Sequence, residues 1–410
     1  MPLQHASPPG HFNWRIPVTH RQGSRHGRLM FVGGQCDLDA QGGVLHPGEL
    51  LAQADACMRH VASVLDGLGG RTEDLVKLNV FHAGTSVEDE LSLLRAIRRH
   101  VTGAVPPVIS LVALPCLAYP GSMVTIDAVA VDNRDGGAPR QASMAEGLAP
   151  WPDGAAFSHG LRCGELLFVS AQSAKDAQGL VTHRDDIAAQ AQATIDNIGR
   201  VLAGMGAELD DVVKLNTWFV GFGTDEDWRR AARVRSEAFR FPGPGATGVP
   251  VPSRYPDGAL IRQDCWAVRG TDGRPLPRSL SWPKGHWDWP IPVTFQQGVK
   301  VGRLIFLGGQ YACDTAGLAQ RPGEREAQTT ITMAFIRDVL AGFGATLDDL
   351  AMTKCFYASD GSAEALHANL ALRSAHFADP AGPTTSVPLR TMGLEGLMLE
   401  IEGIAVLDGD

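Results

Sequence analysis

Two carboxylates stand two residues apart near the C-terminal end of the chain, in a Leu-Glu-Ile-Glu run that ends at residue 402. The alternating apolar and β-branched residues around them predict a strand, and strand residues two apart point to the same face. Glu400 and Glu402 therefore form a candidate paired-carboxylate site, in which the pKa of one carboxyl rises if water is excluded. Position 402 is also acidic in two earlier copies of the strand, as Asp127 and Asp264. A structural ion pair or hydrogen bond is the alternative interpretation of that position.

Other candidates for chemistry are one histidine and several arginines. An imidazole titrates near neutral pH, so His20 could act as a general acid or base if it reaches a cleft. The alternative is a surface histidine, since its neighbours are polar. Arg235 and Arg373 occupy matching places in two predicted helices, whereas Arg254 and Arg390 follow predicted strands. Each guanidinium could hold a carboxylate, and solvated surface arginines are the alternative.

These residues belong to three copies of one unit. An apolar run that ends in Gly-Gly-Gln or Ser-Ala-Gln occurs three times, and we call it the glutamine strand. Its closing residues Gln35, Gln172 and Gln310 lie 172 − 35 = 137 and 310 − 172 = 138 residues apart. A period of this length fits a whole domain rather than a solenoid repeat. The three tandem units are predicted at 1–138, 139–274 and 275–410.

Within each unit the pattern predicts the glutamine strand, an amphipathic helix, a second strand, a second helix and two final strands. This order is βαβαββ, an α+β layer with the helices on one face of a sheet. The final strand pairs are predicted at 108–113 with 123–131, 246–251 with 260–268, and 384–389 with 397–406. Segments 133–143 and 270–279 are interpreted as linkers, because they are polar and contain glycine or proline.

Composition limits the possible partners. A net charge of −9 gives no basic surface for nucleic acid. No run reaches the roughly 18 apolar residues of a membrane span, and the N-terminus has no signal-peptide core. Seven cysteines without a Cys-x-x-Cys pair predict free thiols and a cytoplasmic location. The thirteen histidines contain no metal-binding spacing, so we expect neither a metal nor another cofactor.

The order of motifs resembles one known family. The Gly-Gly-Gln strand, a glutamine-bearing helix that ends in Gly-x-Gly, an Asp-Asp-x-Val-Lys strand and a final Glu-Ile-Glu-Gly-Ile-Ala-Val are similar to those of the Rid family. These proteins are the reactive intermediate deaminases, also called YjgF-like or L-PSP endoribonucleases. The order of motifs occurs three times, and the three copies together cover nearly the whole chain. The resemblance implies a chorismate-mutase-like fold and, because family members form homotrimers with clefts between subunits, an intrachain pseudo-trimer.

The resemblance also implies where the site residues fall. The family's carboxylate-binding arginine is replaced in every unit, by Val108, Ala246 and Thr384. The family's water-activating glutamate falls at Thr125, Arg262 and Glu400, so only the third unit keeps the acid. The family's tyrosine falls at His20, Phe157 and Phe295, and its small strand residue stays a serine only at Ser170.

We therefore expect hydrolysis or deamination of a small nitrogen-containing metabolite, an enamine, imine or amide, in a cleft between units, with Glu400 activating water. The residues expected around Glu400 and Glu402 are Thr384, Ser386, Arg373, Arg390, His20, Phe157, Phe295 and Ser170. The alternative is a non-catalytic ligand-binding or scaffold protein, which the missing arginine favours. Ribonuclease activity is disfavoured by the acidic charge. Further association of pseudo-trimers stays open.

Overall fold

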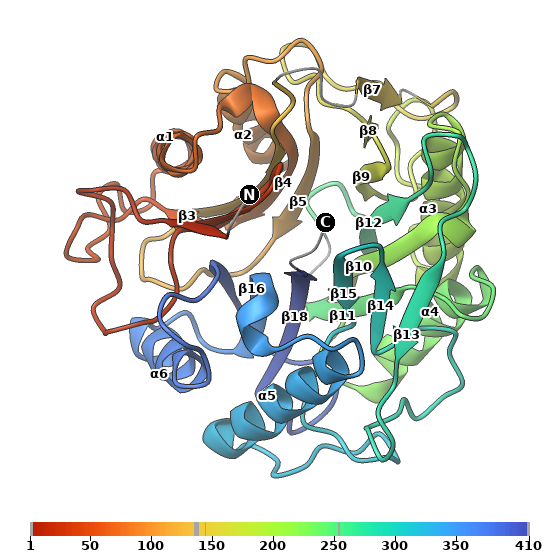
Figure 1. The fold of residues 1–410 in the computed structure, drawn as a ribbon. Coiled ribbons are helices and arrows are strands. Elements are labelled where there is room, and N and C mark those ends of the chain that lie inside the picture. Colours follow the sequence, from red (N-terminus) through yellow and green to blue (C-terminus); the bar gives the residue numbers. More distant parts are fainter. Residues whose placement is uncertain (1–2, 135–138, 144, 253–254, 408–410) are drawn as a thin grey trace.

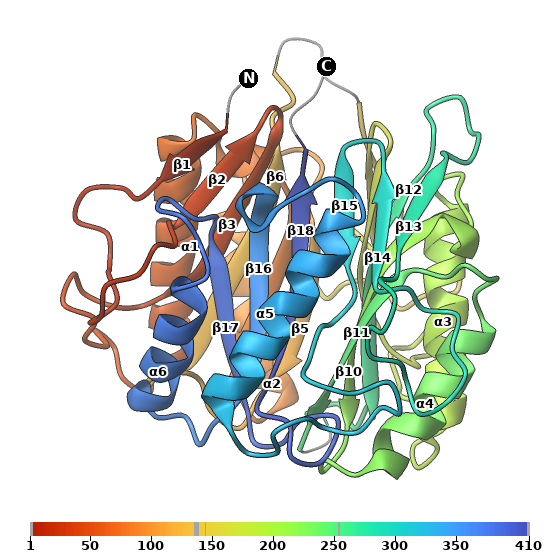
Figure 2. The ribbon, with the colours of Figure 1, turned by 60° about the horizontal axis from the view of Figure 1, so that its bottom comes forward.

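The computed structural model describes residues 3–134, 139–143, 145–252 and 255–407. Three units of similar build surround a common axis, with their helices outside and their strands towards the centre (Figure 1). Each unit forms one six-stranded sheet. In Figure 2, α5 and α6 lie side by side across the outer face of the third sheet. The predicted α+β fold of three tandem chorismate-mutase-like units is therefore confirmed.

The first unit shows the topology that the others repeat. Its sheet has the order β1-β2-β3-β6-β4-β5, in which β4 and β5 are parallel and all other neighbours are antiparallel. Its elements are β1 (Gln4–Ala6), β2 (Gly23–His26), β3 (Leu29–Cys36), α1 (Leu50–Gly67), β4 (Leu75–His82), α2 (Val87–Arg98), β5 (Val108–Ala113) and β6 (Val124–Val131).

The other two units have the same order of elements. The second contains β7 (Arg140–Ser143), β8 (Gly160–Cys163), β9 (Leu166–Gln172), α3 (Ile187–Ala203), β10 (Val212–Val220), α4 (Asp225–Glu237), β11 (Gly245–Val251) and β12 (Ile261–Val268). The third contains β13 (Arg278–Ser281), β14 (Gly298–Val301), β15 (Leu304–Leu307), α5 (Arg325–Ala341), β16 (Leu350–Ala358), α6 (Ala363–Ser374), β17 (Thr384–Leu389) and β18 (Leu399–Val406). One short 3-10 helix precedes each of β4, β10 and β16.

Two strands per unit were missing from the predicted βαβαββ order. Each unit begins with two short strands before the glutamine strand, so the observed order is βββαβαββ. The predicted linkers were wrong at their ends, because Arg140–Ser143 forms β7 and residues 278 and 279 begin β13. These are four-residue edge strands in which three of the four side chains are polar. They therefore carry no apolar alternation by which a sequence pattern could reveal them.

The second helix of each unit begins at a side-chain cap. The hydroxyls of Ser86, Thr224 and Ser362 accept hydrogen bonds from backbone N–H groups three residues later, at 3.0, 3.3 and 3.3 Å. Such caps fix the first residue of a helix. Ile97, Arg235 and Arg373 are equivalent, because each lies eleven residues after its cap. All three side chains are buried on the inner face of their helices.

The glycine pair of the glutamine strand lies at an irregularity in the sheet. The register between β3 and β6 shifts between Val32 and Gln35, which includes Gly33. A β-carbon on Gly33 would lie 2.8 Å from the carbonyl oxygen of Thr384, which belongs to the third unit. The missing side chain therefore allows a neighbouring backbone to approach closely.

The common axis is filled by an apolar cluster and a ring of ion pairs. The phenylalanines of the three glutamine strands, Phe31, Phe168 and Phe306, are completely buried there. In each unit, a buried lysine also forms an ion pair with an acidic residue of the next unit. The pairs are Lys77 with Asp264 at 2.9 Å, Lys214 with Glu402 at 2.9 Å, and Lys354 with Asp127 at 3.2 Å. These cross-unit pairs compensate charges that would be costly to bury alone.

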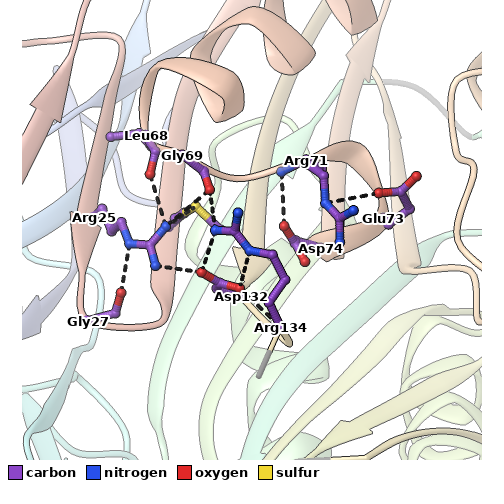
Figure 3. A network of polar contacts seen from close by, with 10 residues as sticks. Arg25, Gly27, Leu68, Gly69, Arg71, Glu73, Asp74, Asp132 and Arg134 are labelled. Carbon is purple, nitrogen blue, oxygen red and sulfur yellow. Dashed lines mark hydrogen bonds and ion pairs between the residues drawn. The ribbon is translucent and has the colours of Figure 1, made fainter. Parts of the chain in front are cut away.

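A separate network of hydrogen bonds and ion pairs lies at one end of the first unit (Figure 3). Arg25 of β2 donates to the carbonyl of Leu68, after α1, and binds Asp132, after β6, at 2.6 Å. Arg134 holds the same carboxylate at 2.7 Å. These arginines lower the pKa of Asp132. The network joins β2, the end of α1 and the end of β6, which makes it a structural feature of this unit.

Candidate functional site

Three clefts lie between the units, and we name them by the units that they join. Cleft 1/2 brings β5 against β9, cleft 2/3 brings β11 against β15, and cleft 3/1 brings β17 against β3. Strand pairing makes Ile109, Ala246 and Thr384 equivalent, because they lie opposite Leu78, Leu215 and Thr353 of the preceding strands. The placement of the family's arginine at Val108 was therefore wrong by one residue. The correct residue, Ile109, is not an arginine either.

Glu400 lies in cleft 2/3 together with an arginine from the second unit. Its carboxyl group and the guanidinium of Arg235 line one cavity of about 30 Å³, and both side chains are at least 96% buried. No ion pair joins these two side chains among the described residues. Aromatic side chains complete the wall, namely Trp228, Trp289, Phe295 and Tyr311.

Two glycines make room for these two charged groups. A β-carbon on Gly309, the second glycine of the third glutamine strand, would lie 1.8 Å from Oε1 of Glu400. A β-carbon on Gly248 would lie 3.3 Å from Nη1 of Arg235, and the backbone N–H of Gly248 also hydrogen-bonds Glu400. The missing side chains at both positions therefore set the shape of the cavity.

Burial shifts the pKa of both charged groups in cleft 2/3. Desolvation raises the pKa of Glu400 to about 8, and Lys214 opposes this rise. Desolvation also lowers the pKa of Arg235 to about 10. Arg235 donates to Thr217 Oγ1 at 2.9 Å and to the carbonyl of Ala231 at 3.2 Å, which holds the guanidinium in place. Cleft 2/3 thus contains a cation and a carboxyl group able to exchange a proton near neutral pH.

Glu402 lies two residues further along β18 but has different partners. It is held by Lys214 at 2.9 Å and by Lys354 at 3.8 Å, in the ring of ion pairs at the axis. Although burial opposes the shift, these lysines lower the pKa of Glu402. The ion-pair interpretation of this position therefore describes the geometry of Glu402, while the raised pKa belongs to Glu400.

Cleft 1/2 carries the opposite arrangement. Arg262 replaces the glutamate on the last strand and binds both carboxylate oxygens of Glu90, from α2, at 2.9 Å. Asp257 accepts a further bond from Arg262 at 3.1 Å, and the ring of Tyr255 lies 4.0 Å from its guanidinium carbon. Although burial opposes the shift, Arg262 lowers the pKa of Glu90 to about 2. A cavity of about 360 Å³ opens beside this ion pair.

Cleft 3/1 contains a buried arginine that is held by neutral groups. Arg373 donates to Asn369, Thr384 and Ser386 at 2.9, 2.8 and 2.8 Å. His20 donates from Nδ1 to the carbonyl of Gly382 at 2.8 Å. Burial, followed by the charge of Arg373, lowers the pKa of His20 to about 3. The interpretations of His20 and Arg373 as surface residues were therefore wrong, since both are at least 97% buried.

The predicted residues do not form one site, because they are divided among the three clefts. Cleft 2/3 contains Glu400 and Phe295, cleft 1/2 contains Phe157 and Ser170, and cleft 3/1 contains His20, Arg373, Thr384 and Ser386. The expected grouping of Glu400 with Thr384 and Ser386 was wrong. Strand β16 separates β17 from β18, so these strands face different neighbouring units. Arg390 is exposed, and Arg254 lies outside the described residues.

Some residues of these clefts were not among the expected site residues. For Arg235 the sequence contained a clue, because this residue occupies the same place in its helix as Arg373. Glu90 had none, because an acid in the first turn of a helix is ordinarily explained by helix electrostatics. Its partner, Arg262, lies in another unit. No helix within the described residues combines the length and apolar character that a bilayer crossing requires.

Three compact units around an axis, with a cleft at each boundary, define a fused trimer of one small α+β fold. The family model for endoribonuclease L-PSP matches residues 18–132, 149–262 and 291–407. The chain therefore belongs to this family, which is the Rid or YjgF-like family of the sequence comparison.

Individual relatives correspond to single units or to the fused fold. A RutC family protein of Pyrococcus abyssi is 31% identical over 121 residues, which is 30% of this chain and 91% of the relative. A RutC family protein of Saccharolobus solfataricus is 35% identical over 113 residues, 28% of this chain and 86% of the relative. The crystal structure of a chorismatase matches 82% of this chain and 93% of its own, with a TM-score of 0.54 and 15% identity. That likeness shows a shared fold.

Proposed function

We propose that cleft 2/3 hydrolyses a small imine or enamine that carries a carboxylate, with Glu400 activating water and Arg235 holding the carboxylate. The observation that carries this proposal is the shared cavity, which Glu400 and Arg235 line without touching each other. A guanidinium without a carboxylate partner can accept the substrate's carboxylate. It would replace, from a helix, the arginine that the family places on the fourth strand.

The proposed reaction needs only a substrate, water and one proton acceptor. The carboxylate of Glu400 takes a proton from water, and the oxygen bonds to the imine carbon while the electron pair moves to nitrogen. Nitrogen takes up the proton held by Glu400, which gives a carbinolamine. Glu400 then moves the proton of the new hydroxyl group to nitrogen, the carbonyl forms, and the carbon–nitrogen bond breaks to release ammonia and a 2-oxo acid. The cavity holds about two water molecules at most. A substrate therefore needs some of the side chains that line the cavity to move, and Leu394 and Leu397 are among them.

The test is turnover of a freshly generated 2-imino acid by the full-length chain. We expect Glu400→Gln to lower kcat/KM at least about a hundredfold, as is typical for loss of a general base. The matched control is Thr125→Ala, the equivalent strand position in the first unit, which should leave the rate unchanged. Equal turnover by Glu400→Gln and the unmodified protein would overturn the assignment.

The pH profile gives a second test of the same residue. Because the carboxylate form is the base and the pKa of Glu400 is raised to about 8, kcat/KM should rise about tenfold per pH unit below pH 8 and then level off. A rate that is flat from pH 5 to 9 would exclude Glu400 as the base.

Binding without catalysis is the second candidate function. The specific observation that favours it is the small volume of the cavity in cleft 2/3, which in this conformation admits only water. A carboxylate that binds with an affinity dependent on Arg235, without turnover of any imine, would support this alternative.

A further inference from the structure

A second, larger cavity lies in cleft 1/2, apart from Glu400 and Arg235. Its volume of about 360 Å³ is within the range of about 300–1,000 Å³ for small-molecule sites. The lining includes the apolar side chains of Leu91 and Leu94 and the indole of Trp151. It also includes the polar side chains of Gln172 and Ser173. The second unit differs from the third at this place, and that difference indicates what the cavity could hold.

Equal spacing identifies the corresponding residues of the two units. Gly147 and Gly285 both have positive φ, and each lies ten residues before an aromatic residue of the cleft, Phe157 or Phe295. The closing glutamine follows fifteen residues after that aromatic residue in both units. This alignment pairs Leu148 with His286, Ala149 with Trp287 and Ser173 with Tyr311.

A repeated hydrogen bond supports the alignment. In the third unit, Gln297 donates from Nε2 to the carbonyl of Trp287 at 3.2 Å. In the second unit, His159 at the same position donates from Nε2 to the carbonyl of Ala149 at 3.1 Å. The two backbones therefore follow the same course, and the units differ in the side chains that fill the space.

In the third unit, aromatic side chains fill the corresponding space. The indole of Trp287 is 1% exposed and lies 4.2 Å from the ring of Tyr311 and 4.6 Å from the ring of Trp289, centroid to centroid. Its ring N–H donates to Oε1 of Gln310 at 3.2 Å, and His286 contacts the same oxygen at 2.8 Å. The indole is thus held by ring contacts and by one amide oxygen.

The second unit keeps the receiving groups but lacks the indole. Ala149 and Ser173 replace the contacting rings of Trp287 and Tyr311, and the side chain of Leu148 cannot donate a hydrogen bond. Gln172 still donates from Nε2 to the carbonyl of Ser170 at 3.0 Å. Within the described part of the chain, no group donates to its Oε1. Trp151 remains at the position of Trp289, so a ring platform and a hydrogen-bond acceptor both border the empty space.

The charged groups beside the cavity neutralise one another. Arg262 is bound by Glu90 and Asp257, and Lys175 binds Asp257 at 2.6 Å. Two cations and two carboxylates therefore leave no net charge, and each makes a close ion pair. A charged ligand would lose its hydration without gaining a counter-ion, so the site favours an uncharged ligand.

We propose that this cavity binds an uncharged, planar heteroaromatic molecule with a ring N–H, about the size of indole. The ligand takes the place that Trp287 occupies in the third unit. Its N–H donates to Oε1 of Gln172, and its ring packs on Trp151 as Trp287 packs on Trp289. This site is independent of the hydrolysis proposed for cleft 2/3.

The experiment is titration of the full-length protein with indole in a calorimeter. We expect one saturable site per chain. Ala149→Trp restores the side chain of the third unit, so it should weaken indole binding at least about tenfold by filling the cavity. The matched control, Phe12→Trp, introduces the same side chain at the equivalent place in the first unit, which a buried phenylalanine already fills, and should leave binding unchanged.

Two further measurements keep the proposal falsifiable. 1-Methylindole lacks the N–H donor and should bind about fivefold more weakly than indole, as expected for one lost hydrogen bond. If Ala149→Trp does not fold, Ser173→Tyr tests the same space from another lining position. Absence of saturable indole binding, or equal binding by the filled variant, would overturn the proposal. Glu400→Gln should not change indole binding, which separates this result from the fate of the proposed hydrolysis.

Discussion

Clefts 1/2 and 2/3 contain the same two kinds of charge in exchanged places. In cleft 1/2 the arginine, Arg262, is on the last strand and the carboxylate, Glu90, is on the second helix. In cleft 2/3 the carboxyl group, Glu400, is on the last strand and the arginine, Arg235, is on the second helix. The first pair is in contact at 2.9 Å, whereas no ion pair joins the second.

The contacting pair in cleft 1/2 suits a structural role, whereas the separated groups in cleft 2/3 suit proton transfer. A bidentate pair in contact lowers the pKa of its carboxyl group and leaves it unable to take up a proton near neutral pH. A carboxyl group that is buried and kept apart from its cation has a raised pKa and can exchange a proton there. A homotrimer would have to change all three clefts together, but three fused units can differ.

The largest expected effect on stability concerns Arg262. Arg262→Met leaves Glu90 and Asp257 buried with one cation fewer, which should lower the free energy of unfolding by about 3–5 kcal/mol. Arg235→Met removes two hydrogen bonds, to Thr217 and to the carbonyl of Ala231, and no contacting ion pair, so we expect about 1–2 kcal/mol. Urea denaturation of both variants measures the difference. Equal losses would show that the two arginines do not differ in structural role.

The next effect concerns the glycine beside Glu400. Gly309→Ala places a β-carbon where Oε1 of Glu400 now lies, so the carboxyl group must move and turnover should fall at least about tenfold. Gly34→Ala is the matched control, because a β-carbon there meets methyl groups of Thr125 and Thr385 at 3.1 Å. Similar rates for the two variants would mean that the position of Glu400 is unimportant for activity.

The last effect is a pH dependence of stability, which is spread over several pH units. Glu400 keeps its proton in the folded state up to about pH 8 but loses it near pH 4.5 when unfolded. Folding therefore binds a proton in this window, and the contribution of Glu400 to stability falls as pH rises from 4.5 to 8, by at most about 1.4 kcal/mol per unit. Glu400→Gln removes this titration. Its stability relative to the unmodified protein should rise across the window and stay constant above it.

Much of the fold followed from sequence patterns. The final strands were predicted within two residues of their observed limits, because each is a run of apolar and β-branched residues between turn signals. The short edge strands β7 and β13 were missed, since three of the four side chains in each are polar. The ring of ion pairs was considered only as an alternative at position 402, because each lysine and its acid lie in different units.

The sequence by itself determined that this chain consists of three related units, because a repeated motif needs no contact to be visible. The resemblance to the family also led us to predict that the arginine of the family's fourth strand is absent and that only the third unit keeps the glutamate. Only the tertiary structure decided which residues share a cleft. Each cleft joins strands from two units, and neighbouring strands of one sheet face different partners. Glu400 therefore meets Arg235, which is 165 residues earlier in the chain, rather than residues close to it in sequence.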